Sequence, residues 1–140
     1  MGVSADAPYL DMAYKLVKYE ARPVLKLSPG KETLTSDKQV FRFSTPLGFL
    51  EKDTIGLRND VFANAESLLK KVMDKGSTVF VSPSLPEIQE IFFKEFQKLD
   101  PGYKSLEGPE EDYPVSLSPQ LKKLQTEITQ QIKSREFEHS

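Results

Sequence analysis

The residues of this sequence that could perform chemistry are few, and none has the partners that catalysis requires. The chain of 140 residues contains no cysteine and one histidine, His139. A histidine that acts as a general base or metal ligand needs a partner and a fixed pocket, and a frayed chain end supplies neither. Within this sequence, thiol chemistry, zinc–thiolate sites and histidine-dependent triads are therefore excluded.

An acidic cluster is the second candidate. Glu110, Glu111 and Asp112 follow one another in a predicted loop. Their carboxylates could bind a hard cation, but the spaced ligands and the glycine of a calcium loop are missing. A solvated run of charge explains the cluster better. We therefore predict no metal-binding residue.

Basic residues on or near the first predicted strands are the third candidate. Alternating strand positions could place some of them on one face, where they could bind phosphate. The glycine-rich pattern that cradles phosphate is absent, so a solvated sheet face is the simpler interpretation. We expect neither catalytic nor cofactor-binding residues in this chain. The five basic residues are Arg22, Lys26, Lys31, Lys38 and Arg42.

The overall charge argues against several classes of partner. Lysine plus arginine is 19 and aspartate plus glutamate is 21, for a formal charge of −2. This balance does not attract nucleic acid or an anionic membrane. No run approaches the roughly 20 apolar residues of a membrane span, and the first residues lack the pattern of a secretory signal. We expect a cytoplasmic protein.

The elements that must position these residues begin with strands. Apolar and polar residues alternate, and turn residues separate the runs. Two hairpin-like segments are expected in the first half, with turns at residues 20–23 and 28–31. The predicted strands are residues 14–19, 24–27, 39–43, 48–50 and 54–57.

Residues 66–81 allow two interpretations. Residues 66–73 contain good helix formers, and their apolar members fit one helical face. However, residues 74–76 (Asp-Lys-Gly) precede the β-like run 77–81, which favours a turn and a hairpin.

Two helices follow. Ser84 can cap the first, with Pro86 in its first turn and Glu87 at the capping-box spacing. Residues 100–102 (Asp-Pro-Gly) end it. One apolar stripe runs along this helix and consists of Leu85, Ile88, Ile91, Phe92, Phe96 and Leu99.

Three phenylalanines form the densest aromatic cluster. Phe92 and Phe96 lie on the apolar stripe, so we expect them to be packing residues. Phe93 lies at its edge and is the better candidate for contact with another lobe or subunit.

The last helix opens at Ser118-Pro119, since proline suits the first helical position. We expect residues 134–140 to fray. Leu121, Leu124, Ile128 and Ile132 share one face.

Strands first and helices last indicate an α+β fold. The predicted architecture is antiparallel β-hairpins in the N-terminal half followed by two C-terminal amphipathic helices. We expect one domain over residues 1–140, divided into a β-hairpin segment, 1–48, and a segment with a hairpin and helices, 49–140.

An ordered set of motifs resembles the C-terminal region of the nicotinate phosphoribosyltransferases. The fragments span nearly the whole chain in the order and approximate spacing of that family. Two positions depart from it: Thr35-Ser36 replaces a Pro-Gly, and Ala21 stands where glycine is common in the first hairpin turn. The motifs are Asp6-Ala7-Pro8, Tyr14-Lys15-Leu16-Val17, Arg22-Pro23-Val24-Leu25-Lys26-Leu27-Ser28, Gly30-Lys31 with Thr33, Lys38-Gln39-Val40-Phe41-Arg42, Pro83-Ser84-Leu85-Pro86-Glu87-Ile88, and Tyr113-Pro114-Val115 with Leu117-Ser118-Pro119 and Leu121.

The resemblance has structural and functional implications. It implies a hairpin at residues 66–81, with strands 68–73 and 77–81. The family joins nicotinate to the ribose of 5-phosphoribosyl 1-pyrophosphate with coupled ATP hydrolysis, and the full-length enzyme uses Mg. Its phosphorylatable histidine and phosphate loops lie in a barrel domain that precedes the matched region. No catalytic residue therefore carries over to this chain.

The implied partners are the missing barrel and N-terminal parts of the same enzyme, which forms a homodimer at full length. The apolar stripes would then bury against surfaces that this chain does not contain. The alternative is an independent protein-interaction module without enzymatic activity. A small stand-alone transferase is disfavoured, because the histidine and the phosphate loops are missing.

Overall fold

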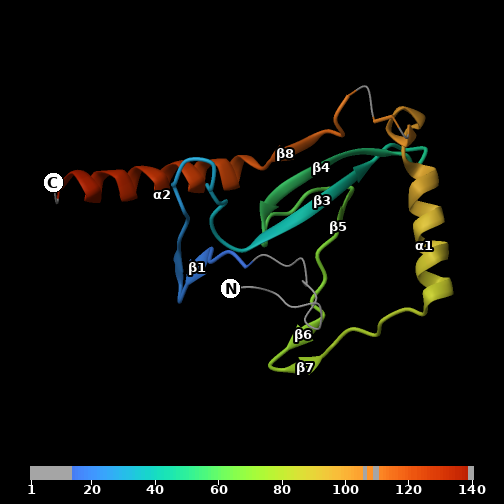
Figure 1. Cartoon of the computed structure of the whole chain (residues 1–140), viewed down its shortest axis with the longest axis horizontal. Helices are drawn as coiled ribbons and strands as arrows, with labels where there is room; N and C mark the ends of the chain where they lie inside the picture. The colour runs from blue at the N-terminus through green and yellow to red at the C-terminus, as the bar shows by residue number, and fades with distance from the viewer. Residues whose placement is uncertain (1–13, 106, 109–110, 139–140) are drawn as a thin grey trace, which may run out of the picture. The chain divides into compact units, whose positions relative to one another are not determined.

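The computed structural model describes residues 14–105, 107–108 and 111–138, with the backbone alone for 136–138. Its chain divides into two compact units, one of residues 37–123 and one of residues 1–36 with 124–140. Figure 1 shows the elements in chain order. They are β1 (Lys18–Tyr19), β2 (Arg22–Pro23), β3 (Lys38–Ser44), β4 (Leu50–Leu57), β5 (Ala65–Ser67), β6 (Met73–Asp74), β7 (Ser77–Thr78), α1 (Leu85–Lys98), a 3₁₀ helix (Pro101–Lys104), β8 (Val115–Leu117) and α2 (Pro119–Glu138).

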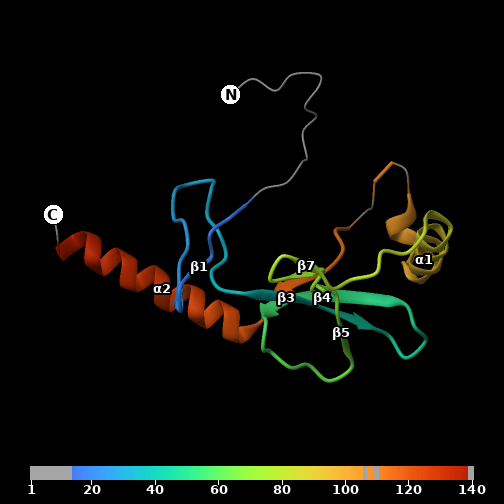
Figure 2. The ribbon, with the colours of Figure 1, turned by 90° about the horizontal axis from the view of Figure 1, so that it is seen from below.

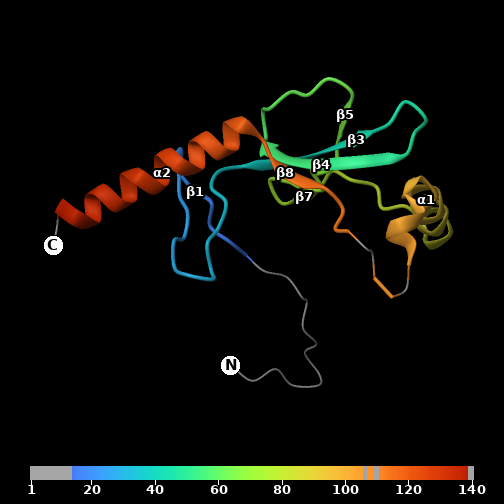
Figure 3. The same ribbon diagram turned by 90° about the horizontal axis from the view of Figure 1, so that it is seen from above.

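A mixed sheet with the strand order β5-β3-β4-β8 forms the centre of the larger unit. β3 and β4 are an antiparallel hairpin, and they run side by side in Figures 2 and 3. A register shift after Phe43 marks a β-bulge near the turn. β5 pairs antiparallel with β3, whereas β8 returns late in the chain and pairs parallel with β4.

The core of this unit is small and aromatic. Phe41 is buried, and its ring contacts Phe62 edge-on at a centroid distance of 4.8 Å. Phe43 contacts the same ring at 5.8 Å. Gly56 of β4 lies close to the Phe41 ring, and an added Cβ there would come within 2.6 Å of the Asp60 carboxylate and 3.0 Å of that ring. Only glycine permits this close approach.

The smaller unit is built on a hairpin and a hydrogen-bonded loop. β1 and β2 pair across a two-residue turn in which Glu20, and not Ala21, has positive φ (53°). The Val17 carbonyl accepts hydrogen bonds from the amides of Val24 (3.0 Å) and Ser36 (2.9 Å). These bonds continue the pairing beyond the strands and hold the loop ends together.

The predicted turn at residues 28–31 is confirmed. The Lys31 amide donates to the Ser28 carbonyl at 2.9 Å, and Gly30 has a φ of 69°. Proline followed by a glycine of positive φ is typical of a type II turn.

Several strand boundaries differ from the prediction. The expected strand 14–19 is reduced to β1, and the expected strand 24–27 is wrong, because its place is taken by β2 within the expected turn 20–23. The expected strand 54–57 is the end of a longer strand, β4, whereas residues 48 and 49 of the expected strand 48–50 belong to the turn that precedes it. The charged residues 51–53 do not suggest a strand by themselves, and two of them, Lys52 and Asp53, have their register partners on β3.

The hairpin at residues 66–81 is confirmed in type, and the helical interpretation is wrong. The end of β5 reaches residue 67, and the hairpin itself consists of β6 and β7, which are shorter than the expected strands 68–73 and 77–81. The Val79 amide donates to the Val72 carbonyl at 3.0 Å beyond β6 and β7. Both predicted helices are present, although α2 continues through Glu138, past the expected fraying point at residue 134. The α+β architecture is confirmed, while the division at residue 48 stays a prediction.

Candidate interaction surface

The start of α1 is fixed by local hydrogen bonds. The Ser84 amide and the Ser84 hydroxyl both donate to the Glu87 carboxylate, at 2.7 and 2.6 Å. These bonds lower the pKa of Glu87, because they favour its ionised form. Pro86 lies in the first turn, as predicted. The helix therefore begins where the sequence indicates, without help from a distant residue.

The apolar stripe of α1 is exposed. No residue of this helix is buried. Phe92 and Phe96 were expected to pack, yet they are 59% and 41% exposed, and Phe93 is 53% exposed. Leu85, Ile88 and Ile91 are also exposed, from 47% to 82%. The pattern correctly predicted the helix and its apolar face, but within the described chain nothing buries that face.

The aromatic side chains of this surface are ordered against one another. The Phe92 and Phe96 rings stack at a centroid distance of 5.7 Å, and Phe93 meets Phe92 edge-on at 5.7 Å. Lys104 places its ammonium 5.3 Å from the centre of the Phe96 ring and donates to the Gln97 carbonyl at 3.3 Å. Stacking of this kind pre-forms a rigid apolar surface. We call Leu85, Ile88, Ile91, Phe92, Phe93 and Phe96 the α1 face.

The other side of α1 is suited to water. Lys94 pairs with Glu90 at 2.6 Å. The pair with Lys94 lowers the pKa of Glu90. Such exposed pairs within one helix contribute little to stability, but they keep one side solvated. The α1 face is therefore the side that a partner could bury.

The hairpin that precedes α1 adds further exposed apolar side chains. In β6 and the flanking residues, Val72 and Met73 are 55% and 60% exposed. On the returning side, Val79 and Val81 are 54% and 91% exposed. Large apolar side chains that stay exposed on consecutive elements of the chain are typical of an interaction surface.

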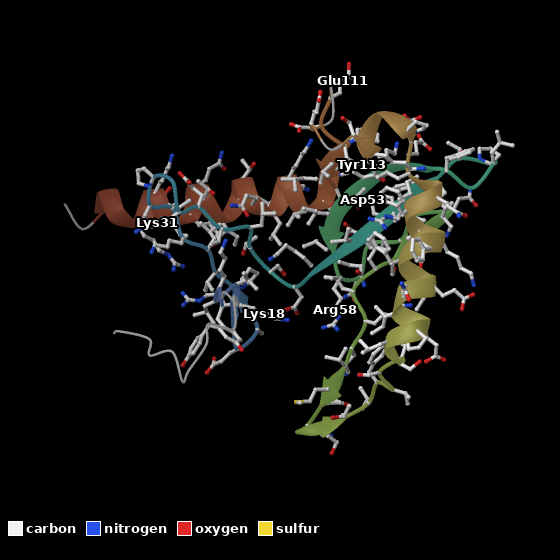
Figure 4. All side chains as sticks on the ribbon, turned by 45° about the vertical axis from the view of Figure 1, so that its right-hand side comes forward. Lys18, Lys31, Asp53, Arg58, Glu111 and Tyr113 are labelled. Atoms are coloured by element: carbon white, nitrogen blue, oxygen red, sulfur yellow. The ribbon has the colours of Figure 1, made fainter. Side chains whose placement is uncertain are left out.

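A charged network in the sheet was missed by the sequence analysis. Arg42 forms two hydrogen bonds with Asp53, Nε to Oδ1 at 3.0 Å and Nη2 to Oδ2 at 2.9 Å. The Tyr113 hydroxyl donates to the same carboxylate at 3.3 Å. Figure 4 labels Asp53 and Tyr113, which lie close together. Hydrogen bonding to Asp53 raises the pKa of Arg42, whereas burial raises that of Tyr113. Asp53 is only 8% exposed, so this network fixes the sheet rather than presenting charge to a ligand.

The five predicted basic residues are divided between the two units. Arg42 is occupied by Asp53, and Lys38 is half-buried, which lowers its pKa. Lys26 and Lys31 lie in the smaller unit and line the same hollow, together with Lys15. Arg22 is exposed on β2.

The acidic and histidine candidates are described only in part. Glu111 and Asp112 are exposed, while Glu110 and His139 lie outside the described residues. Within the described ranges, no group of three His, Cys, Asp or Glu side chains is arranged to hold a metal ion. Neither helix, over its described length, is long and apolar enough to cross a membrane.

Comparison with known proteins gives a consistent result. A family model described as the nicotinate phosphoribosyltransferase C-terminal domain matches residues 60–125, which include all of α1. The nicotinate phosphoribosyltransferase pncB2 of Mycobacterium tuberculosis is 34% identical over 120 residues, covering 85% of this chain and 26% of the relative. The mouse nicotinate phosphoribosyltransferase is 30% identical over 141 residues, covering 84% and 26%.

A solved structure supports the fold. The crystal structure of human nicotinic acid phosphoribosyltransferase matches 84% of this chain with a TM-score of 0.71 at 22% identity. The chain spans about a quarter (26%) of the length of the relatives it matches. The resemblance predicted from the ordered motifs is confirmed: over most of its length, this chain is similar to the C-terminal region of nicotinate phosphoribosyltransferases.

Proposed function

We propose that this chain is the C-terminal, non-catalytic portion of a nicotinate phosphoribosyltransferase, with a structural role in the protomer. The observation that carries the proposal is the α1 face, an ordered apolar surface that is 41% to 82% exposed. It occurs in a chain that spans 26% of the length of its relatives. The remaining parts of the same enzyme are the occupant that best explains both facts.

The energetics favour a covered face. Fully burying one large apolar side chain contributes about 1.5–3 kcal/mol, and the face presents several on one side of a capped helix. Phe92 and Phe96 are already stacked, so little further ordering is needed on docking. The face therefore suits a permanent intramolecular contact.

The proposal places the chemistry outside this chain. The full-length enzyme would convert nicotinate, 5-phosphoribosyl 1-pyrophosphate and ATP to nicotinate mononucleotide, a step of NAD biosynthesis, with Mg. It would act as a cytoplasmic homodimer. We expect the isolated chain to show no turnover with these substrates, and the full-length enzyme to be active.

The first experiment tests the size of the native protein. An antibody raised against this chain should detect, in extracts of its own cells, a protein several times heavier than 15.9 kDa. A sole band at 15.9 kDa would contradict the proposal and favour an independent interaction module.

The second experiment tests the α1 face. We expect the isolated chain to self-associate at micromolar concentration in analytical ultracentrifugation, because its apolar face is uncovered. Phe92→Glu should abolish this association. Gln97→Glu adds the same charge on the polar side of α1 and should leave it unchanged.

In the longer protein, Phe92→Glu should lower the midpoint of thermal unfolding, whereas Gln97→Glu should not. Equal midpoints for the two variants would show that the face stays uncovered in the enzyme. That result would contradict the proposed structural role.

A further inference from the structure

The smaller unit contains a hollow of about 600 Å³ that carries only positive charge among its described lining residues. This volume lies in the range of small-molecule sites. Three lysines, Lys15, Lys26 and Lys31, line it. None of their ammonium groups has a carboxylate partner among the described residues.

The backbone that carries two of these lysines is held rigidly. Lys26 and Thr33 bond to each other twice, through the Lys26 amide to Thr33 Oγ1 at 2.9 Å and the Thr33 amide to the Lys26 carbonyl at 3.1 Å. Between them, the turn from Ser28 to Lys31 closes with its own hydrogen bond of 2.9 Å. Lys26 and Lys31 are thus presented from the two sides of one closed loop.

A second set of hydrogen bonds anchors this loop to α2. The side-chain amide of Gln125 donates to the Thr33 carbonyl at 3.1 Å and accepts from the Thr35 amide at 2.9 Å. Thr35 is fully buried, and its hydroxyl donates to the Val24 carbonyl at 3.0 Å. The loop is therefore held in one conformation before a ligand binds, so less loop entropy is lost on binding.

The chemistry of the hollow selects a multiply charged anion with an apolar extension. Several ammonium groups in a concave site focus a positive field and act as point-charge ligands for phosphate oxygens. The rest of the described lining includes Leu16, Val24 and Leu25, and Tyr14 offers an exposed aromatic ring. Aromatic rings of this kind stack on nucleobases.

We propose that Lys15, Lys26 and Lys31 bind the polyphosphate group of a nucleoside di- or triphosphate, or inorganic pyrophosphate. Figure 4 labels Lys31 on the loop of this unit. The site differs from the sequence-based expectation that the chain binds no cofactor. It does not depend on the function proposed above, because it lies wholly within residues of this chain.

The test is a titration of the ¹⁵N-labelled chain with sodium pyrophosphate and, separately, with ATP. Amide signals of Gly30, Lys31 and Thr33 should shift in a saturable manner. Those near the second hollow, which is lined by Asp100 and Glu111, should not. Tighter binding of ATP than of pyrophosphate would indicate that Tyr14 and the apolar lining residues contact the nucleobase. Equal affinities would indicate that the site recognises the polyphosphate group alone.

A double variant, Lys26→Gln with Lys31→Gln, should raise the dissociation constant about tenfold or more, since two charge-assisted contacts are lost. Lys26→Arg with Lys31→Arg should retain most of the affinity. The control, Lys94→Gln with Lys98→Gln, removes the same charge from α1 and should change the constant less than about twofold.

Two results would overturn the proposal. One is the absence of saturable shifts in the unsubstituted chain at low ionic strength. The other is an equal loss of affinity in the two glutamine variants, which would reduce the effect to overall charge. The dispersed amide signals of Thr33 and Thr35 verify in each variant that the loop is intact.

Discussion

The two helices of this chain make opposite use of their sequence patterns. α1 has a continuous apolar stripe and a self-contained capping box, yet none of its residues is buried. α2 is more polar, but its Leu121 has no exposed surface. The strength of an amphipathic pattern therefore shows that a face needs a partner, and does not show that the partner lies in the same chain.

The caps of the two helices differ in the same way. Ser84, ahead of α1, bonds only with near neighbours: its amide and hydroxyl donate to Glu87, and its carbonyl accepts from the Ile88 amide at 2.9 Å. Ser118, ahead of α2, accepts from the Leu121 amide at 3.1 Å, donates to Asp60 at 2.7 Å, and pairs its own amide with the Ile55 carbonyl at 2.9 Å. One helix starts by a local signal, whereas the start of the other is tied to the sheet of the larger unit.

The largest expected effect is at the start of α2, where Leu121 is buried. Leu121→Ala should lower the free energy of unfolding by about 2–5 kcal/mol, through lost burial and the cavity left behind. Ile88→Ala on the exposed face of α1 should change it by about 0.5 kcal/mol or less in the isolated chain. Urea denaturation followed by circular dichroism measures both, and equal losses would contradict the contrast.

The features that the sequence predicted correctly are local ones. The capping box at Ser84, the turn at residues 28–31 and the opening of α2 at Ser118 each depend on residues a few positions apart. The bond of Ser118 to Asp60 crosses 58 positions, and that of Gln125 to Thr33 crosses 92. No periodicity or spacing in the sequence could have found these pairs.

The Arg42–Asp53 pair lies between these extremes. The two residues are direct partners in the β3–β4 register. A continuous strand from Leu50 to Leu57 would have revealed the pair, but the charged residues 51–53 suggested a break. The surface role expected for Arg42 was therefore wrong, because a cross-strand carboxylate occupies it.

A smaller effect is expected where α2 holds the loop of the smaller unit. Gln125→Ala should cost about 1–3 kcal/mol locally, because the Thr35 amide and the Thr33 carbonyl lose their partner. Hydrogen exchange at the Thr35 amide should accelerate accordingly. Gln131→Ala, on an exposed position of the same helix, is the control. Unchanged exchange in the Gln125 variant would mean that the loop holds itself without α2.

The smallest effect concerns the cap of α1 and its dependence on pH. Hydrogen bonds from Ser84 lower the pKa of Glu87 in the folded helix. A group whose folded pKa is depressed stabilises the fold above its unfolded pKa, and this contribution is lost as the pH falls through the folded value. The start of α1 should therefore begin to lose this stabilisation as the pH falls below about 4.3, the ordinary value for glutamate, and lose it fully below the lower folded pKa.

The pH dependence can be followed in the ¹³C shifts of residues 85–88. Glu87→Gln, which keeps an acceptor for the Ser84 amide, should remove this pH dependence while preserving helix. Added salt should raise the pKa of Glu90, which is lowered by its exposed pair with Lys94, but should affect Glu87 less, because short hydrogen bonds are screened less than an exposed ion pair. An equal response of both carboxyls to salt would show that the cap acts as surface charge only. The start of α1 would then owe its position to Pro86 and to the chain that precedes it.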